Sequence, residues 1–231
     1  IYQACLEVEE KARALAAHLL EVAPEDIAVG GGRYTVRGTD RLMTLTEISE
    51  AARVSANLPN GMEAGLDTRA VGKVADPTFP NGCQICELEV DPETGAVEIL
   101  RYCDVGEFGR VLNPMIVEGQ IHGGIAQGVG QALMEDCRYD PDSGQLLSAS
   151  FMDYTLPRAD DLPNFDTATK EILCTTNPLG IKGAGEAGTI GALAAVMNAL
   201  MDALAPLGVR HIDMPATPET VWRAIRDARQ I

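Results

Sequence analysis

The chain has 231 residues, of which 46% are hydrophobic and 23% are charged, and its formal net charge is −16. This composition predicts a globular chain that forms one large domain or two small lobes. The negative charge argues against binding to nucleic acid or to an anionic membrane. The chain does not open with a signal-peptide pattern. We also expect no apolar run as long as the roughly 20 residues of a membrane-spanning helix.

The first part of the chain, residues 1–80, predicts a small α+β lobe. A helical pattern of apolar residues opens it, and a short strand pair flanks the three glycines at residues 30–32. Thr44 and Glu47 have the spacing of a capping box, which predicts the start of a second helix. A loop-rich stretch with several prolines, residues 57–82, then connects this lobe to the rest of the chain.

Residues 81–231 predict a second α+β lobe, which carries the candidate functional motifs. Alternating apolar side chains predict a hairpin of two strands, residues 83–90 and 96–105, joined by a turn at residues 91–95. A last helix is expected to begin after Thr217, with proline at its first position. The sequence therefore predicts an α+β fold made of two mixed α/β lobes.

The cysteines raise the question of a metal site or a disulfide framework. Cys83 and Cys86 form a CxxC pair, but the alternating pattern places them on a strand, where residues three apart point to opposite faces. No second CxxC pair and no histidine pair completes a zinc site. We expect no metal site made of protein side chains, and free, buried thiols in a reducing compartment, which indicates a cytoplasmic location.

The segment from Asn113 to Glu135 combines a helical apolar stripe with five glycines. A glycine inside a helix costs about 1 kcal/mol relative to alanine, so close packing must compensate. The packing partner is either the backbone of another helix or a cofactor, and the pattern leaves both open. Gln120 and Gln127 carry amides that suit hydrogen bonding to a neutral heterocycle and do not suit metal ligation.

A glycine-rich turn, residues 177–191, places the carboxylate of Glu186 just before an apolar helix. Its glycines also fit the GxGxxG spacing of dinucleotide-binding loops, but a proline and a glycine interrupt the approach from the strand-like residues 171–175, and Glu186 would repel a phosphate. We interpret Glu186 as a general base, with a solvated helix-terminal glutamate as the alternative. The helix dipole favours the ionised form of the Glu186 carboxylate, whereas burial would raise its pKa. The sequence does not decide which of these two effects is larger.

Three segments together, in this order and with this spacing, closely resemble the C-terminal part of the molybdenum hydroxylase large subunit. They are residues 118–133, 153–157 and 177–191. The family contains xanthine dehydrogenase, aldehyde oxidase and aerobic carbon monoxide dehydrogenase, and the resemblance extends over essentially the whole chain. It implies that this chain is the second of two large-subunit domains that bind the molybdopterin cofactor between them.

Carried over residue by residue, the resemblance implies that Glu186 is the active-site base beside molybdenum and that Gln120 contacts the pterin. The implied cofactor is molybdopterin with molybdenum, in the cytosine dinucleotide form. The protein supplies positioning and electrostatics, because the redox chemistry belongs to the cofactor. Further cofactor contacts are implied for four residues: Gln127, Lys182, Gly183 and Gly185.

The resemblance also implies the reaction and its partners. Relatives oxidise aldehydes, purines, N-heteroaromatics or carbon monoxide with water as the oxygen source. The 2Fe–2S and FAD groups are expected only on partner domains or subunits of a heteromeric oligomer. Because residue 1 is Ile rather than Met, we expect the chain to begin within a longer protein, as an isolated domain, a proteolytic product or a processed subunit. The resemblance implies that the preceding half of the large subunit is missing, so we expect the chain to be inactive alone. A non-catalytic assembly domain and a nicotinamide-dinucleotide-binding oxidoreductase stay open as alternatives.

Overall fold

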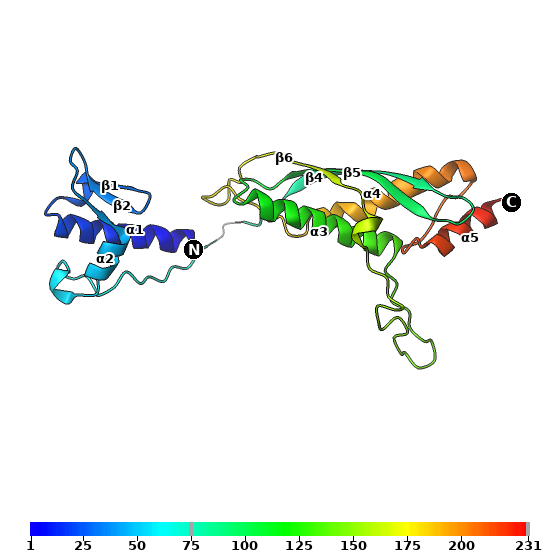
Figure 1. Ribbon diagram of the computed structural model, residues 1–231, viewed down its shortest axis with the longest axis horizontal. Coiled ribbons are helices and arrows are strands. Elements are labelled where there is room, and N and C mark those ends of the chain that lie inside the picture. The colour runs from blue at the N-terminus through cyan, green and yellow to red at the C-terminus, as the bar shows by residue number, and fades with distance from the viewer. Residues whose placement is uncertain (74–75, 230–231) are drawn as a thin grey trace. The chain divides into compact units, whose positions relative to one another are not determined.

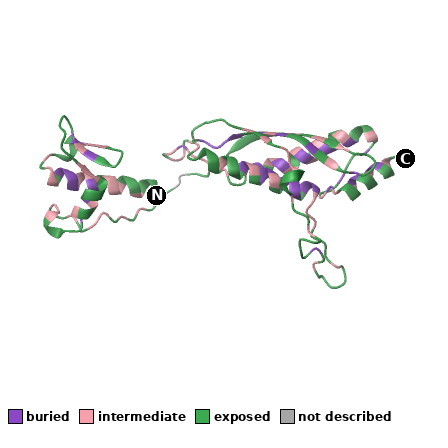
Figure 2. Ribbon diagram, in the orientation of Figure 1, coloured by how far each residue is buried: buried purple, intermediate pink, exposed green. Residues whose placement is uncertain are grey.

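The computed structural model describes residues 1–73 and 76–229, and the chain forms two compact units, Ile1–Lys73 and Val74–Ile231. Each unit combines helices with a sheet and has a hydrophobic core of its own (Figures 1 and 2). The predicted α+β class with two mixed lobes is confirmed.

The first unit packs two helices against an antiparallel sheet of order β1-β2-β3. Gly31 and Gly32 have positive φ angles and turn the chain between β1 and β2, as the triple glycine predicts. The capping box is also confirmed, because the side chains of Thr44 and Glu47 each accept a hydrogen bond from the other residue's backbone N–H. The elements are α1 (Tyr2–Leu19), β1 (Ile27–Gly30), β2 (Arg33–Val36), β3 (Leu42–Thr44) and α2 (Leu45–Ala51).

The second unit is built on a sheet of order β4-β5-β6, with β4 antiparallel and β6 parallel to β5. The predicted hairpin is confirmed as β4 (Asn81–Val90) and β5 (Val97–Glu107). The third strand, β6, spans Phe165–Thr169. The strand expected at residues 171–175 is wrong, because these residues leave the sheet as irregular chain before the glycine-rich turn.

Helices α3 (Pro114–Leu133) and α4 (Ala187–Leu204) pack against each other, α4 also packs against β4, and α5 (Pro218–Ala228) follows. Glycines allow the two backbones to approach closely. A Cβ atom on Gly124 would lie 2.8 Å from the Thr189 nitrogen, and one on Gly188 would lie 2.5 Å from the Ile121 oxygen. Helix contact therefore accounts for these glycines, whereas Gly123 faces open space.

Helix α4 corrects one expectation. With its 3₁₀ extension it forms an apolar segment of 21 residues, Ala187–Leu207, with a mean hydropathy of 1.6, so the expectation that no run reaches a membrane-spanning length is wrong. A core helix of a globular domain meets the same criterion, and α4 buries Ala192, Val196 and Leu200 in the core of this unit. Its outer face includes Ile190, which is 81% exposed.

Candidate functional site

The predicted base and a predicted cofactor contact lie next to each other in the second unit. Glu186 is the N-cap residue of α4, and its exposed side chain makes no capping hydrogen bond in the described structure. The neighbouring Gly185 faces α3, where a Cβ atom built on it would lie 3.6 Å from the Gln120 Oε1 atom. The fold thus brings Glu186, Gly185 and Gln120 together from segments that are far apart in the sequence.

Two further predicted residues flank this group. Gln127 lies two turns after Gln120 on the exposed side of α3, and its Oε1 atom accepts a hydrogen bond of 3.2 Å from Thr189 Oγ1 of α4. Gly183 is exposed, and a Cβ atom built on it would meet no atom within 4 Å. The turn consequently has free space on the side where Gly183 lies.

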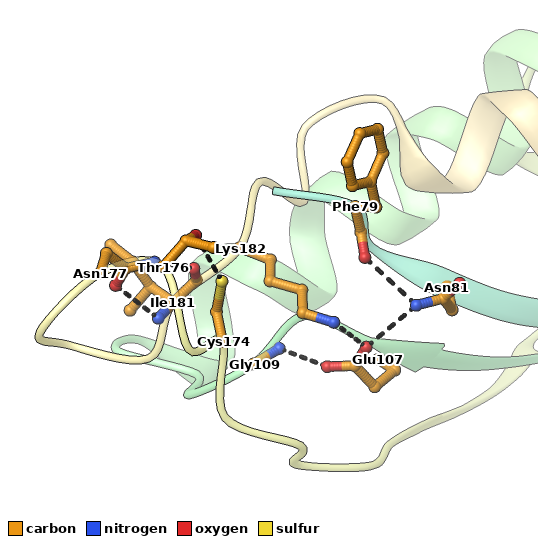
Figure 3. A network of polar contacts seen from close by, with 9 residues as sticks. All are labelled: Phe79, Asn81, Glu107, Gly109, Cys174, Thr176, Asn177, Ile181 and Lys182. Atoms are coloured by element: carbon orange, nitrogen blue, oxygen red, sulfur yellow. Dashed lines mark hydrogen bonds and ion pairs between the residues drawn. The ribbon is translucent and has the colours of Figure 1, made fainter. Parts of the chain in front are cut away.

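Lys182 has a different environment from the one we expected. Its ammonium forms an ion pair with Glu107 at the end of β5, with side-chain exposures of only 13% and 10% (Figure 3). Glu107 also accepts hydrogen bonds from Gly109 N at 2.7 Å and from Asn81 Nδ2 at 3.2 Å. The Lys182 hydrogen bond is the main cause that lowers the pKa of Glu107. Lys182 therefore anchors the glycine-rich loop to β5, and its contact with a cofactor stays a prediction.

Backbone and amide hydrogen bonds fix the loop before Lys182 (Figure 3). The Asn177 side chain donates to the Ile181 oxygen at 2.8 Å and accepts from the Ile181 nitrogen at 3.1 Å. The Lys182 nitrogen donates to the Phe108 oxygen at 2.9 Å, and Ile181 forms a bridge with Gly109. A loop held in this way places the following carboxylate of Glu186 on a rigid support.

Gln84 holds the other side of the turn. Its amide donates to the backbone oxygens of Ala187 at 3.2 Å and Gly188 at 3.1 Å, and it accepts a hydrogen bond of 2.6 Å from the fully buried Tyr102 hydroxyl. These contacts connect β4 and β5 to the first turn of α4, directly after Glu186. Sequence reasoning missed Gln84, because its partners on α4 lie about a hundred positions away and no local pattern connects them.

A cleft of about 720 Å³ opens beside Glu186, between β4, β5 and the start of α4. Asp104 of β5 lines it, is 3% exposed, and has an Oδ2 atom without a hydrogen-bond partner among the described residues. Burial raises the pKa of the Asp104 carboxyl. A larger hollow of about 1050 Å³ lies in the first unit, but none of the predicted site residues lines it.

The side chains around Glu186 suit an organic cofactor better than a bare metal ion. In the described part of the chain, no three His, Cys, Asp or Glu side chains are grouped to hold a metal. The cysteines are free, but the expectation that they are buried is wrong, because three are exposed and three are partly buried. Exposed amides and open glycines beside Glu186 fit a neutral heterocycle, and a metal at this site would have to be carried by the cofactor itself.

Comparisons with known proteins point to one family. A family model described as a molybdopterin cofactor-binding domain matches residues 1–163. The chain is 41% identical over 221 residues to the 6-hydroxypseudooxynicotine dehydrogenase complex subunit gamma of Paenarthrobacter nicotinovorans, covering 95% of this chain and 28% of that protein. It is 34% identical to the carbon monoxide dehydrogenase large chain of Hydrogenophaga pseudoflava, with 97% and 28% covered.

Solved structures agree in fold. Quinoline 2-oxidoreductase from Pseudomonas putida 86 matches with a TM-score of 0.87 and 40% identity, covering 98% of this chain and 29% of that chain. A carbon monoxide dehydrogenase from Oligotropha carboxidovorans matches with a TM-score of 0.88 and 32% identity. The chain thus spans less than a third of the length of these relatives.

Proposed function

The chain belongs to the molybdopterin cofactor-binding domain family of molybdenum hydroxylase large subunits, and from that premise we propose that it supplies the catalytic base, Glu186, to such an enzyme. The observation that carries the proposal is the position of Glu186. Its side chain is exposed and makes no capping bond in the described structure, and it follows Gly185, where a built Cβ atom would lie 3.6 Å from Gln120 Oε1. A general base must be free to reach the proton that it accepts.

The reaction proposed is the oxidation of an aldehyde, an N-heteroaromatic compound or carbon monoxide, with water as the oxygen source. Molybdopterin, when bound, supplies the redox chemistry of molybdenum. Glu186 accepts a proton at its carboxylate oxygen. The names of the relatives, which include a nicotine hydroxylase and a quinoline oxidoreductase, support N-heteroaromatic compounds as one of these substrate classes.

We assign the cofactor contacts to four residues around the turn that carries Glu186. Gln120 and Gln127 offer amide donors and acceptors to the pterin, and Gly183 and Gly185 allow the cofactor to approach the backbone. The cytosine dinucleotide form of the cofactor is part of this proposal. Lys182 contributes by holding the loop, because its ammonium is paired with Glu107.

The remaining part of the site must come from other chains or segments. We propose the preceding part of the same large subunit as the other wall of the cofactor site, and iron–sulfur and flavin subunits as the electron acceptors. Several relatives are described as a subunit or a large chain of a complex, which supports a heteromeric assembly. Cytoplasmic location stays a prediction.

The molybdenum and pterin contents of the intact complex test this proposal. We expect both in the wild-type complex, and a clear loss of both in Gln120→Ala, because that amide borders the cofactor space. Gln131→Ala is the matched control, since it removes another exposed amide of α3 and should leave the contents unchanged.

A complex that contains no molybdenum and no pterin would support the non-catalytic assembly domain instead. The third alternative, a nicotinamide-dependent enzyme, predicts saturable NAD binding to the isolated chain. The irregular chain that precedes the glycine-rich turn differs from the strand that this motif follows in dinucleotide-binding folds, so we expect no such binding.

A further inference from the structure

Gln84 of β4 has no part in the proposed reaction, yet its side chain reaches the helical turn that follows Glu186. We propose that Gln84 is a positioning residue for Glu186, which restrains the first turn of α4 from outside the helix, and that Gly191 provides the space it needs. The inference rests on the proposed function, because it concerns the placement of the proposed base.

The first argument is that the first turn of α4 is weak by itself. Its N-cap residue, Glu186, makes no capping hydrogen bond in the described structure. Two of its first five residues are Gly188 and Gly191, and glycine is among the least favourable residues in a helix. Helix ends also fray readily. Contacts from outside the helix must therefore hold this turn, and α3 supplies one set of them at Gly188.

The second argument is that Gln84 supplies the contacts on the side of the sheet. Its Nε2 atom donates to the carbonyl oxygens of Ala187 at 3.2 Å and Gly188 at 3.1 Å. A helical carbonyl has two lone pairs, so it can accept from Gln84 and from the backbone N–H four residues later. The Oε1 atom accepts from the hydroxyl of Tyr102, which is fully buried. Three hydrogen bonds thus fix one amide against the two residues that follow Glu186.

The third argument is that Gly191 matches Gln84. A Cβ atom built on Gly191 would lie 2.6 Å from Gln84 Cδ, 2.8 Å from its Oε1 and 3.0 Å from its Nε2. The atoms that would have to move belong to the amide itself, which the three hydrogen bonds hold in place. Gly191 weakens the helix but lets the amide reach its backbone. Both residues line the same cleft as Glu186.

Turnover per bound molybdenum in the intact complex tests the inference. Gln84→Met keeps the length of the side chain and removes its hydrogen bonds. We expect kcat per molybdenum to fall about tenfold with KM unchanged, because a displaced base slows the chemical step and leaves substrate binding intact. Gln145→Met changes an exposed glutamine outside the cleft and is the matched control, which should keep the wild-type kcat.

A double-mutant cycle tests the pairing of Gln84 with Gly191. Gly191→Ala alone should displace the amide and lower kcat per molybdenum about tenfold as well. In the Gln84→Ala background the three nearest atoms that oppose the new methyl group are gone, so Gly191→Ala should cause no further loss. Equal losses from Gly191→Ala in both backgrounds would overturn the pairing.

A merely structural role of Gln84 gives a different result. It would lower the melting temperature or the molybdenum content of Gln84→Met and leave kcat per molybdenum unchanged, which overturns the inference. Hydrogen exchange of the amides of residues 187–191 gives a readout that does not depend on turnover. We expect faster exchange in Gln84→Met than in the wild type and in Gln145→Met.

Failure of the inference can be told apart from failure of the proposed function, because Glu186→Gln is measured in the same complex. Normal turnover in a loaded Glu186→Gln complex overturns the proposed function. If Glu186→Gln loses turnover while Gln84→Met keeps the wild-type kcat and the wild-type exchange rates, the inference alone is overturned.

Discussion

Three carboxyl groups of the second unit illustrate how position sets the role of a residue. Glu107 is paired with Lys182, which lowers its pKa, so it serves as an ionised anchor for the loop. Burial raises the pKa of Asp104 against the opposing effect of the Gln84 side chain, and its Oδ2 atom has no hydrogen-bond partner in the described structure. Glu186 is exposed at the start of α4 and free to react. Only Glu186 has the accessibility that a proton acceptor needs.

The ion pair of Lys182 should stabilise the fold. Lys182→Met removes the ammonium and leaves the nearly buried carboxylate of Glu107 without its main partner, so we expect a loss of about 3 kcal/mol in the free energy of unfolding. Urea unfolding of the 231-residue chain measures this loss. Lys170→Met, at an exposed lysine, is the matched control and should change the midpoint little.

The pH dependence of the same variant checks the mechanism. The pKa of Glu107 is lower in the folded chain than the value near 4.3 of an unfolded glutamate, so its stabilisation is complete above that value. The stabilisation is lost as the pH falls through the folded pKa. The difference between wild type and Lys182→Met should therefore shrink in acid, and a constant difference down to pH 2 would show that packing rather than charge causes it.

Sequence reasoning predicts roles for Glu186 and Gln120 because both lie in motifs that resemble those of a family. It missed Gln84, Asp104 and Glu107, whose importance depends on partners supplied by the tertiary fold. Asp104 did leave a signal, since it occupies a position of β5 where the alternation of the strand predicts an inward side chain. Lys182 and Glu107 are 75 positions apart, and their pairing left no signal in the sequence.

At the scale of elements, the contact between α3 and α4 supports the turn that carries Glu186. Gly124→Ala should lower the stability of the chain by about 2 kcal/mol, because the new methyl group would press on the backbone of α4. Gly123→Ala should instead raise it by up to about 1 kcal/mol, since Gly123 faces open space and alanine favours a helix. Thermal unfolding of the two variants measures these changes in stability. Equal destabilisation in both variants would exclude the contact between α3 and α4 as the cause.

The connection from β5 through Gln84 to α4 should hold the first turn of that helix. Tyr102→Phe removes the hydroxyl that orients Gln84, which should cost about 1 kcal/mol and loosen the turn after Glu186. Hydrogen exchange of the amides of residues 187–191 should become faster in this variant. Tyr139→Phe, at a tyrosine that is 60% exposed, should leave these rates unchanged. Unchanged rates in Tyr102→Phe would mean that Gln84 is held in place without the tyrosine.

Elements with local signals were predicted well. The capping box, the glycine turn of the first unit and the β4–β5 hairpin are each encoded within a few residues, and the structure confirms them. The sequence of α4 does not define a buried face, because apolar residues surround the helix and its packing against α3 and β4 selects which of them are covered. The predicted apolar stripe of α3 is confirmed, because Ile121, Ile125 and Val129 are buried. This helix has polar residues on its outer face, and they distinguish that face from the buried one.

At the scale of the whole molecule, the chain spans 28% of curated relatives such as the carbon monoxide dehydrogenase large chain. We predict that the 231-residue chain alone binds little molybdopterin and shows no turnover, because we propose that the preceding part of the large subunit forms the other wall of the cofactor site. Metal analysis of the purified chain, compared with the complete large subunit expressed in the same host, measures this difference. Equal molybdenum in both samples would show that this chain contains the whole cofactor site.

The most direct test of the account is Glu186→Gln in the complete enzyme. The amide has nearly the same shape as the carboxylate but cannot accept the proton, so we predict unchanged molybdenum and pterin contents with turnover reduced by about four orders of magnitude. Turnover is measured with the substrate that the wild-type enzyme oxidises, which is an aldehyde, an N-heteroaromatic compound or carbon monoxide. Near-normal turnover in a fully loaded variant would contradict the assignment of Glu186 as the base.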